Sequence, residues 1–486
     1  MNKAKDKSQP DQINIKKFCT VVLICYIFLV ISFYFLAGHE LHFRSSSNNI
    51  NMPEAKYATI ELIAGSVIEQ TFTTEIQRLE SISIQWGAYG RQNYGTDIIE
   101  ILDLKNDILL LKQTVDAAEI VEGSITEFSF NKPLEGLSGV PLMIRITSMD
   151  SMAGSAISPM MNIDAGKTAN SLSINGQPVK GTLCFSVTGE DYIWFGLHFW
   201  QFSIILFCLL SLFLLAFYIR FKKGKKSQLL YAIVAVKKYH FLIRQLVSRD
   251  FKSKYKRSIL GILWSFLNPL LTMVIQYIVF STIFKANIPH YQVYLLIGII
   301  MFNYFSEACG MTLTSILGNA SLITKVYVPK YIYPLSRVLS SGINLLISLI
   351  PLLFVIIFTG VKITPSYLLT IYSLFCLVVF CLGLGMLLAS SMVFFRDTQF
   401  LWGVFSMIWM YATPIFYPES ILPPAFSFVL QINPIYYFIQ FARTCILNGV
   451  SPEPMLYLQC VLFALGMFFV GALTFKKTQD KFILYI

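Results

Sequence analysis

The sequence contains little charge for its length. Asp, Glu, Lys and Arg make up 13% of the 486 residues, whereas 55% are apolar. A soluble globular protein has about 25% charged and about 45–50% apolar residues. The composition therefore excludes an ordinary water-soluble enzyme and predicts a protein that crosses a membrane several times.

Motifs for catalysis or metal binding are also lacking. The nearest match to a phosphate-binding glycine loop is Ala165-Gly166-Lys167-Thr168, but Met161 stands where the first glycine is required. The five histidines form no cluster with cysteines or paired carboxylates. No nucleophile and base can be paired from the sequence. We therefore expect no enzyme activity, no metal site and no bound cofactor in this chain.

Cysteines are scarce between residues 38 and 192, and carboxylates are scarce within the long apolar segments. Cys184 is the single cysteine between residues 38 and 192, so that region has no internal disulfide. Within the apolar segments Glu307 is the one clear carboxylate. Transporters driven by ion gradients normally carry several buried ionisable groups. The sequence thus argues against ion-coupled transport and for energy supplied by another subunit.

What the sequence has in abundance is long apolar segments. Residues 18–37 and 193–219 are long enough to cross about 30 Å of hydrocarbon. Six more follow, near 262–284, 293–316, 335–359, 367–391, 399–417 and 455–475. The first segment is too long for a signal-peptide core and lacks a small-residue cleavage site, so we favour an uncleaved anchor.

The charges divide the chain into a basic and an acidic part. Residues 43–192 hold 10 basic and 18 acidic groups, and the remaining residues hold 28 basic and 9 acidic groups. Thirteen Lys or Arg lie between Arg220 and Arg257. The positive-inside rule then predicts eight spans, with both termini cytoplasmic. Residues 38–192 are expected outside the membrane.

The outer region has the pattern of a β-sandwich. Residues 81–86, 98–102 and 142–146 alternate apolar and polar side chains, as strands do. Turn signals recur at Tyr89-Gly90, Asn131-Lys132-Pro133 and Asn175-Gly176. Short strands over about 150 residues favour a sandwich, with a jelly roll as one form.

These patterns predict six regions. They are a basic cytoplasmic tail (1–17), a span (18–37), a β-rich outer domain (38–192), a second span (193–219), a basic linker with an interfacial helix (220–257), and a six-span domain (258–486) with a re-entrant outer segment at 418–454. The re-entrant reading follows because its apolar stretches are too short to cross and are broken by Pro423-Pro424 and Asn433-Pro434.

Two segments predicted to be cytoplasmic have unusual patterns. Residues 239–257 carry apolar side chains at helical spacing on one side and basic ones on the other, which predicts a helix lying in the membrane interface. Residues 321–330 carry apolar and aromatic side chains between lysines, more than a simple cytoplasmic loop needs. We interpret the second stretch as a docking element.

The order of motifs in this half resembles a known family. The stretches that carry the resemblance are Arg249-Asp250-Phe251-Lys252, Tyr255, Ser258, Leu260-Gly261, Trp264, Pro269, residues 280–284, residues 325–329, Phe395-Arg396-Asp397, residues 413–417 and Asn433-Pro434. They are similar to ABC-2 type permeases, in the branch that exports polysaccharides, O-antigens and teichoic acids. The resemblance covers residues 235–486. The two-span outer-domain module before it departs from the family.

The resemblance implies a permease that forms a homodimer and pairs with two copies of a separate ATPase, which hydrolyses ATP with Mg. It implies an ATPase-docking set of Arg249, Asp250, Lys325, Tyr327, Pro329, Arg396 and Asp397. The exported glycan, linked to undecaprenyl diphosphate, would pass between the permeases. Aromatic candidates for lining that path are Trp264, Phe266, Tyr277, Trp402, Trp409, Tyr411, Phe416 and Tyr417. Candidates for attracting the lipid diphosphate are Lys252, Lys254, Lys256 and Arg257.

Other functions stay open at this point. The same machine could export a small lipid or a drug, or the outer domain could belong to a membrane receptor or a chain-length regulator. A membrane glycosyltransferase would need acidic residues near the membrane that the spans lack. For the outer domain itself, glycan binding, a scaffold for assembly or an outer partner, and chain-length control are all hypotheses, the first by analogy of fold alone.

Overall fold

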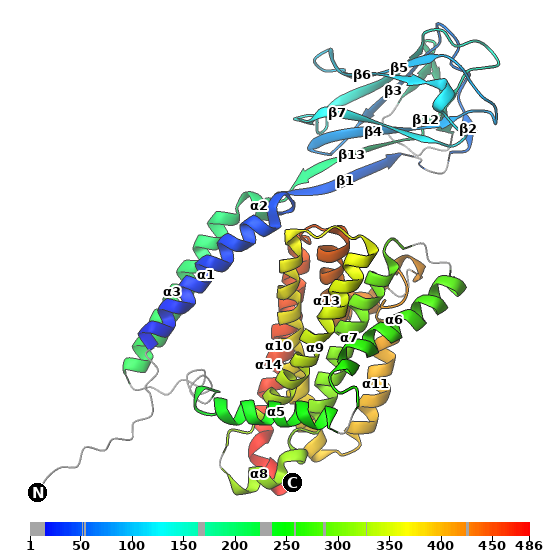
Figure 1. Cartoon of the computed structure of the whole chain (residues 1–486). Helices are drawn as coiled ribbons and strands as arrows, with labels where there is room; N and C mark the ends of the chain where they lie inside the picture. Colours follow the sequence, from blue (N-terminus) through cyan, green and yellow to red (C-terminus); the bar gives the residue numbers. More distant parts are fainter. Residues whose placement is uncertain are drawn as a thin grey trace, which may run out of the picture. The chain divides into compact units, whose positions relative to one another are not determined.

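The computed structural model describes residues 15–50, 52, 55–163, 171–223, 236–256, 259–284, 288–326, 328–423 and 427–486. The chain forms two compact units (Figure 1). One comprises Met1–Leu41 with Phe199–Ile486, and the other is His42–His198. The glycine-loop match at residues 165–168 lies outside the described residues.

The first unit is helical, with a predominantly apolar set of long helices. Its helices are α1 (Ile15–Ala37), α3 (Phe199–Lys222), α5 (His240–Tyr255), α6 (Leu263–Phe284), α7 (Tyr291–Leu313), α8 (Ala320–Lys325), α9 (Ile332–Thr359), α10 (Thr370–Phe394), α11 (Thr398–Ala412), α12 (Ser427–Ile432), α13 (Pro434–Arg443) and α14 (Pro454–Thr478). Seven helical segments in the described chain are long and apolar enough to cross a membrane. These seven correspond to seven of the eight predicted spans.

The eighth predicted span, residues 399–417, is shorter in the structure. Helix α11 has 15 residues, which corresponds to about 22 Å and falls short of about 30 Å of hydrocarbon. It ends because Pro414 follows Thr413, and a residue before proline is pushed into extended conformation. Thr413 has φ −104° and ψ 129°. The helical prediction for residues 413–417 is therefore wrong.

The core of the helical bundle centres on α7, with α9, α10, α13 and α14 around it. Most side chains of α7 are buried, including Leu295, Phe305 and Cys309. Helices α10 and α14 approach most closely at two glycines. A Cβ on Gly471 would lie 1.8 Å from the Gly383 carbonyl oxygen, so the backbones touch there, as small residues allow between membrane helices.

The second unit is a sandwich of two antiparallel sheets. Its strands are β1 (Phe43–Ile50), β2 (Tyr57–Ala58), β3 (Val67–Thr73), β4 (Arg78–Gly87), β5 (Thr96–Asp103), β6 (Ile108–Asp116), β7 (Ile125–Glu135), β8 (Pro141–Ser148), β9 (Ser158–Asn162), β10 (Leu172–Ile174), β11 (Gln177–Val179), β12 (Thr182–Leu183) and β13 (Phe185–Tyr192). One sheet follows the order β1-β13-β4-β9-β12, with β2 and β7 attached, and the other the order β11-β10-β3-β8-β5-β6. Phe72 of the second sheet meets Phe185 of the first at 5.2 Å between ring centroids, so one core joins both sheets.

The predicted strands at 81–86, 98–102 and 142–146 are confirmed as parts of β4, β5 and β8. The turn at Asn175-Gly176 is also confirmed, since it joins β10 to β11 with positive φ at both residues. The turn predicted at residues 131–133 is wrong, because β7 runs through it. The pairing with β4 skips from Leu134 to Ser129, and this bulge accommodates Pro133, which has no N–H to donate.

The outer unit begins and ends in adjacent strands. Strands β1 and β13 pair along their full lengths, from Phe43 with Tyr192 to Ile50 with Phe185. The short helix α2 (Trp194–Leu197) follows. The second long helix therefore begins at Phe199, six residues later than predicted.

Candidate functional site

Helix α5 is the amphipathic segment that the sequence predicted. Ile243 and Leu246 are buried in an apolar cluster with side chains of α8, α9, α10 and α14. Arg244, Lys252 and Lys254 are exposed. Figure 1 shows α5 running across the end of the bundle where α8 and the C-terminus lie. Its apolar side therefore packs on the bundle, and its location at the membrane interface stays a prediction.

A charge network anchors α5 to the bundle. The Asp250 carboxylate, 4% exposed, accepts from Arg337 of α9 at 3.1 Å and from the neighbouring Arg249 at 3.0 Å. Arg249 also donates to Asn319 at 3.1 Å. Because Asp250 faces inward, it can act on a cytosolic partner only by positioning α5. The Arg249 side chain is half exposed.

The predicted docking connection, residues 321–330, begins within the short helix α8. Helix α8 buries Ile323 and leaves Lys325 and Val326 exposed. Pro329 is partly buried, and Lys330 donates to the Gln479 carbonyl of the C-terminal segment. Tyr327 lies outside the described residues. Arg396 and Asp397, between α10 and α11, are exposed.

A polar cleft lies under the C-terminal end of α5. Its volume is about 260 Å³. Helices α5, α6, α7 and α9 line it with Lys254, Tyr255, Trp264, Ser265, Asn268, Pro269, Ile300, Asn303, Tyr304, Glu307, Ser341, Asn344, Leu345 and Ser348. The concentration of amides and hydroxyls is unusual for apolar helices, where a polar group without a partner is costly.

An ion pair crosses this cleft. Lys254 Nζ lies 2.8 Å from Glu307 Oε1. The Asn344 amide donates to the same oxygen at 2.6 Å. The Asn344 carbonyl oxygen accepts from Tyr255 at 3.0 Å, and Tyr255 also contacts the Ser265 hydroxyl. The network ties α5 to α6, α7 and α9, so a shift of α5 must change the shape of the cleft.

Two buried side chains, Asn433 and Arg443, hold the segment after α11, which is residues 413–417. Asn433 caps α13 by accepting from the Ile435 amide, and it accepts from the Trp409 indole at 2.8 Å. Arg443, at the end of α13, donates to the carbonyls of Pro414 and Ile415 at 2.8 and 3.0 Å. The Arg443 bonds satisfy two buried carbonyls of the segment after α11, which lie outside any helix.

Comparison with known proteins places this unit in a family. The ABC-2 type transporter profile matches residues 242–447. An O-antigen export system permease protein RfbA of Klebsiella pneumoniae is 31% identical over 244 residues, 50% of this chain and 93% of that protein. The chain belongs to the ABC-2 type transporter family.

More distant relatives align over a similar length. An O-antigen export system permease protein RfbA of Myxococcus xanthus is 29% identical over 250 residues and 95% of its length. The polysialic acid transport protein KpsM of Escherichia coli is 20% identical over 245 residues and 95% of its length. Each of these alignments covers half of this chain. The profile match begins within α5, so the β-sandwich lies outside it.

The eight aromatic candidates for lining the glycan path differ in the exposed fraction of their side chains. Trp264 and Tyr411 are 45% and 61% exposed. Trp402 and Phe416 are 8% and 5% exposed, and they pack against Phe305 and Phe280 within the core. The partly buried rings are Phe266, Tyr277, Trp409 and Tyr417. Within a single copy, Trp264 is the one of the eight that lines the polar cleft.

The basic candidates near the end of α5 are also unequal. Lys252 and Lys256 are exposed. Lys254 forms the ion pair with Glu307, which offsets its charge. Arg257 lies outside the described residues. Lys252 and Lys256 therefore stay candidates for attracting the lipid diphosphate, whereas Glu307 already neutralises Lys254.

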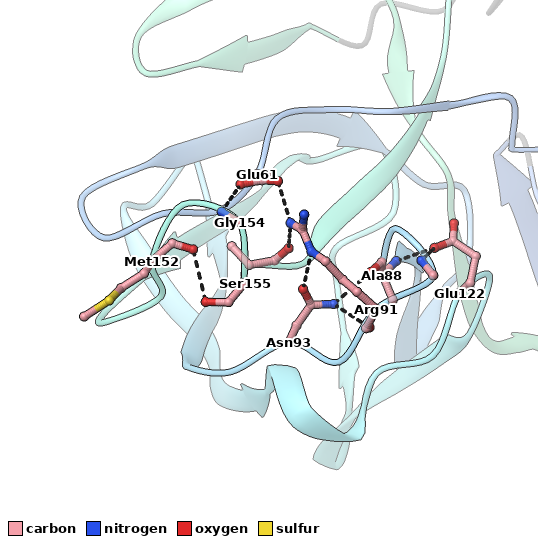
Figure 2. Close-up of polar contacts among 10 residues, drawn as sticks. Glu61, Ala88, Arg91, Asn93, Glu122, Met152, Gly154 and Ser155 are labelled. Atoms are coloured by element: carbon pink, nitrogen blue, oxygen red, sulfur yellow. Dashed lines mark hydrogen bonds and ion pairs between the residues drawn. The ribbon is translucent and has the colours of Figure 1, made fainter.

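The β-sandwich has its own polar network, at one loop end (Figure 2). Arg91 donates to Glu61 at 2.5 Å and to Asn93 at 3.1 Å. The Gly154 amide and Arg91 lower the pKa of the Glu61 carboxyl. Glu122 accepts from the amides of Ala88 and Gly90 and so holds the intervening turn. The network links four connections between strands: β2 to β3, β4 to β5, β6 to β7 and β8 to β9.

Sequence analysis missed several of these residues, although the sequence held a signal for them. Arg337 and Arg443 stand among apolar residues, where a charge could have marked a buried network. Asn268, Asn303 and Asn344 likewise interrupt α6, α7 and α9. Their meeting in one cleft required the tertiary structure. Within the described residues no group of three or more His, Cys, Asp or Glu side chains could hold a metal ion.

Proposed function

We propose that this chain is the permease subunit of an exporter that moves a lipid-linked cell-surface polysaccharide across the bacterial plasma membrane. The similarity to two O-antigen export permeases over 93% of their length supports this proposal. An ABC-2 permease of this class needs ATP hydrolysed by a separate subunit. The lipid carrier in the proposal is undecaprenyl diphosphate, and the cargo is an O-antigen, a teichoic acid or a similar glycan.

The proposed orientation follows from charge. Helix α5, helix α8 with Lys325, and the C-terminal end of α14 lie at the same end of the bundle (Figure 1), and all three carry basic residues. This favours a cytoplasmic location for that end. Both termini are then cytoplasmic, and the β-sandwich faces outward. Lys325, Tyr327, Pro329, Arg396 and Asp397 are the residues that we propose to meet the ATPase.

The proposed assembly has two permeases and two ATPases. Helix α11 supports a second permease copy, because Phe400, Val404, Phe405 and Ile408 leave most of its surface apolar and exposed. Lipid or another permease must cover such a surface. A 15-residue helix cannot span the bilayer by itself, so a protein neighbour fits it better than lipid alone.

Two experiments test the proposal. In the source bacterium, deleting the gene should abolish surface polysaccharide while lipid-linked polymer accumulates inside, and the intact gene should restore it. Unchanged surface polysaccharide would refute the proposed function.

The docking assignment is tested by co-purification with the ATPase subunit. Lys325→Glu and Tyr327→Asp should each remove the ATPase from the detergent-purified permease. Lys362→Glu is the matched control, because Lys362 is an exposed lysine in the connection between α9 and α10, on the opposite side of the proposed topology. If the ATPase stays bound to both variants, the docking residues are assigned wrongly.

A further inference from the structure

The polar cleft between α5, α6, α7 and α9 has the properties of a ligand site. Its side chains come from four helices, and an exposed indole, Trp264, lies at one side. We propose that this cleft binds one uncharged sugar unit of the exported polymer, stacked on Trp264, and that the lipid diphosphate binds elsewhere. This inference rests on the proposed function and names the part of the cargo that the cleft recognises.

The size of the cleft limits its occupant. A volume of about 260 Å³ lies just under the ~300–1,000 Å³ of typical small-molecule sites. It can hold a single sugar ring with its substituents, whereas an oligosaccharide would have to extend beyond it. A cleft of this kind would read one unit of a polymer at a time as the chain moves past.

The hydrogen-bonding groups suit sugar hydroxyls. Glu307 Oε1 is taken by Lys254 and Asn344, and Glu307 Oε2 has no partner among the described residues. Asn303 makes no side-chain hydrogen bond within the described part of the chain. A carboxylate accepts hydrogen bonds from hydroxyls, and a side-chain amide both accepts from them and donates to them, so together they can bind the hydroxyls of a sugar ring.

Trp264 supplies the other half of sugar recognition. Its indole is 45% exposed, although it belongs to the first turn of α6 and borders a polar cavity. An aromatic face gives a large apolar contact at low conformational cost, and the C–H groups of a sugar ring can lie on it. Sugars of different substitution can share such a contact, because it does not depend on one hydroxyl.

The charge of the cleft argues against the diphosphate. Of the described residues that line the cleft, Lys254 and Glu307 carry a formal charge, and they neutralise each other at 2.8 Å. Phosphate sites instead gather several Lys or Arg, or free amide groups of a helix N-terminus. At the N-terminus of α6, which borders the cleft, the amides of residues 263–265 already donate to the carbonyls of residues 260–262. In this cleft a diphosphate would approach the Glu307 carboxylate, which repels it.

The test uses the full-length permease with its ATPase subunit in lipid nanodiscs. Saturation-transfer NMR is recorded with methyl glucoside, methyl mannoside and methyl N-acetylglucosaminide as separate probes, with and without inorganic diphosphate as competitor. The variants are Trp264→Ala, Trp264→Phe and Glu307→Gln. Trp200→Ala is the matched control, because Trp200 is an equally exposed tryptophan of α3 that does not line the cleft.

For at least one probe we expect a signal in the wild type that falls about tenfold in Trp264→Ala and Glu307→Gln. The signal should persist in Trp264→Phe, which keeps an aromatic face, and in Trp200→Ala. Inorganic diphosphate should not reduce it. Trp264 is exposed, so its substitution leaves the fold intact.

Two results would overturn the inference. They are equal signals in the wild type and Trp264→Ala, and displacement of the sugars from the wild type by diphosphate. A chain that exports polysaccharide yet gives one of these results refutes the role of the cleft alone. Loss of the gene without loss of surface polysaccharide refutes the proposed function instead.

Discussion

Asp97 in the β-sandwich gives a prediction whose size can be worked out from the structure. Its side chain is fully buried in β5. The hydroxyls of Ser148 and Ser151 lie beside it without forming well-aligned hydrogen bonds. Burial, with a smaller contribution from Asp150, raises the pKa of Asp97 from 3.8 to about 6. The ionised carboxylate is therefore unfavourable in the folded unit.

The sign of the pH dependence follows from the two pKa values. The folded state keeps the Asp97 proton up to a higher pH than the unfolded chain does. Below about pH 4 both states hold the proton, so Asp97 carries no penalty. As the pH rises through about 6, the folded unit loses about 3 kcal/mol of its free energy of unfolding, at 1.36 kcal/mol for each pKa unit.

Replacing the carboxyl with an amide of the same shape removes this penalty. We expect Asp97→Asn to raise the free energy of unfolding of the β-sandwich by about 2–3 kcal/mol at pH 8 and to leave it nearly unchanged at pH 4. Hydrogen exchange of the β5 and β8 amides in the full-length chain measures this energy at each pH. Glu119→Gln is the control, because the Glu119 side chain is exposed.

One outcome would refute this reasoning. If Asp97→Asn destabilises the unit equally at pH 4 and pH 8, the carboxylate makes favourable native interactions and its burial is not the dominant effect. A stabilisation of the same size in Glu119→Gln would attribute the effect to net charge instead.

Three other predictions concern the helical unit. Asp250→Ala should leave the Arg337 guanidinium without its carboxylate and weaken the hold on α5 by about 2–3 kcal/mol, seen as faster hydrogen exchange in α5; equal exchange in Asp250→Ala and the exposed control Arg244→Ala would contradict this. Gly471→Ala should lower the thermal stability by more than about 2 kcal/mol, because its Cβ meets backbone in α10; Gly466→Ala meets no atom within 4 Å and should not. Asn433→Ala should speed hydrogen exchange at residues 413–417 through a loss of about 2 kcal/mol, since a helix cap and an indole partner both disappear; unchanged exchange there would show that Asn433 does not hold the segment.

Local patterns predicted much of this fold. Helix α5 was predictable because its apolar side chains recur at helical spacing and its charges fill the other side. The strands β5 and β8 were predictable because one face of each is buried, which makes their side chains alternate. Strand β4 also alternates apolar and polar side chains, although its polar face, with Ser81, Ser83 and Gln85, is buried too. Long apolar runs identified seven of the spans directly.

Other features depend on residues far apart in the chain. Lys254 and Glu307 are separated by 53 positions, and no local pattern links them. The bulge in β7 arises from its pairing with β4, which the sequence of β7 alone does not show. Helix α13 is buried, and its Arg443 donates to the carbonyls of Pro414 and Ile415 in the segment that follows α11. The role of Arg443 therefore depends on where α11 ends.

The glycine contact between α10 and α14 has a mechanical consequence for a protein that must open a path for its cargo. Two helices whose backbones touch at Gly383 and Gly471 cannot slide past each other or separate without losing contact along their lengths. Helices α10 and α14 are therefore expected to move together as one rigid body. Motion during transport is then left to the elements joined to the bundle by few side chains, above all α11, and to α5, whose ion pairs can break and form again. During transport, α10 and α14 would stay fixed while α11 and α5 move to open a path for the cargo.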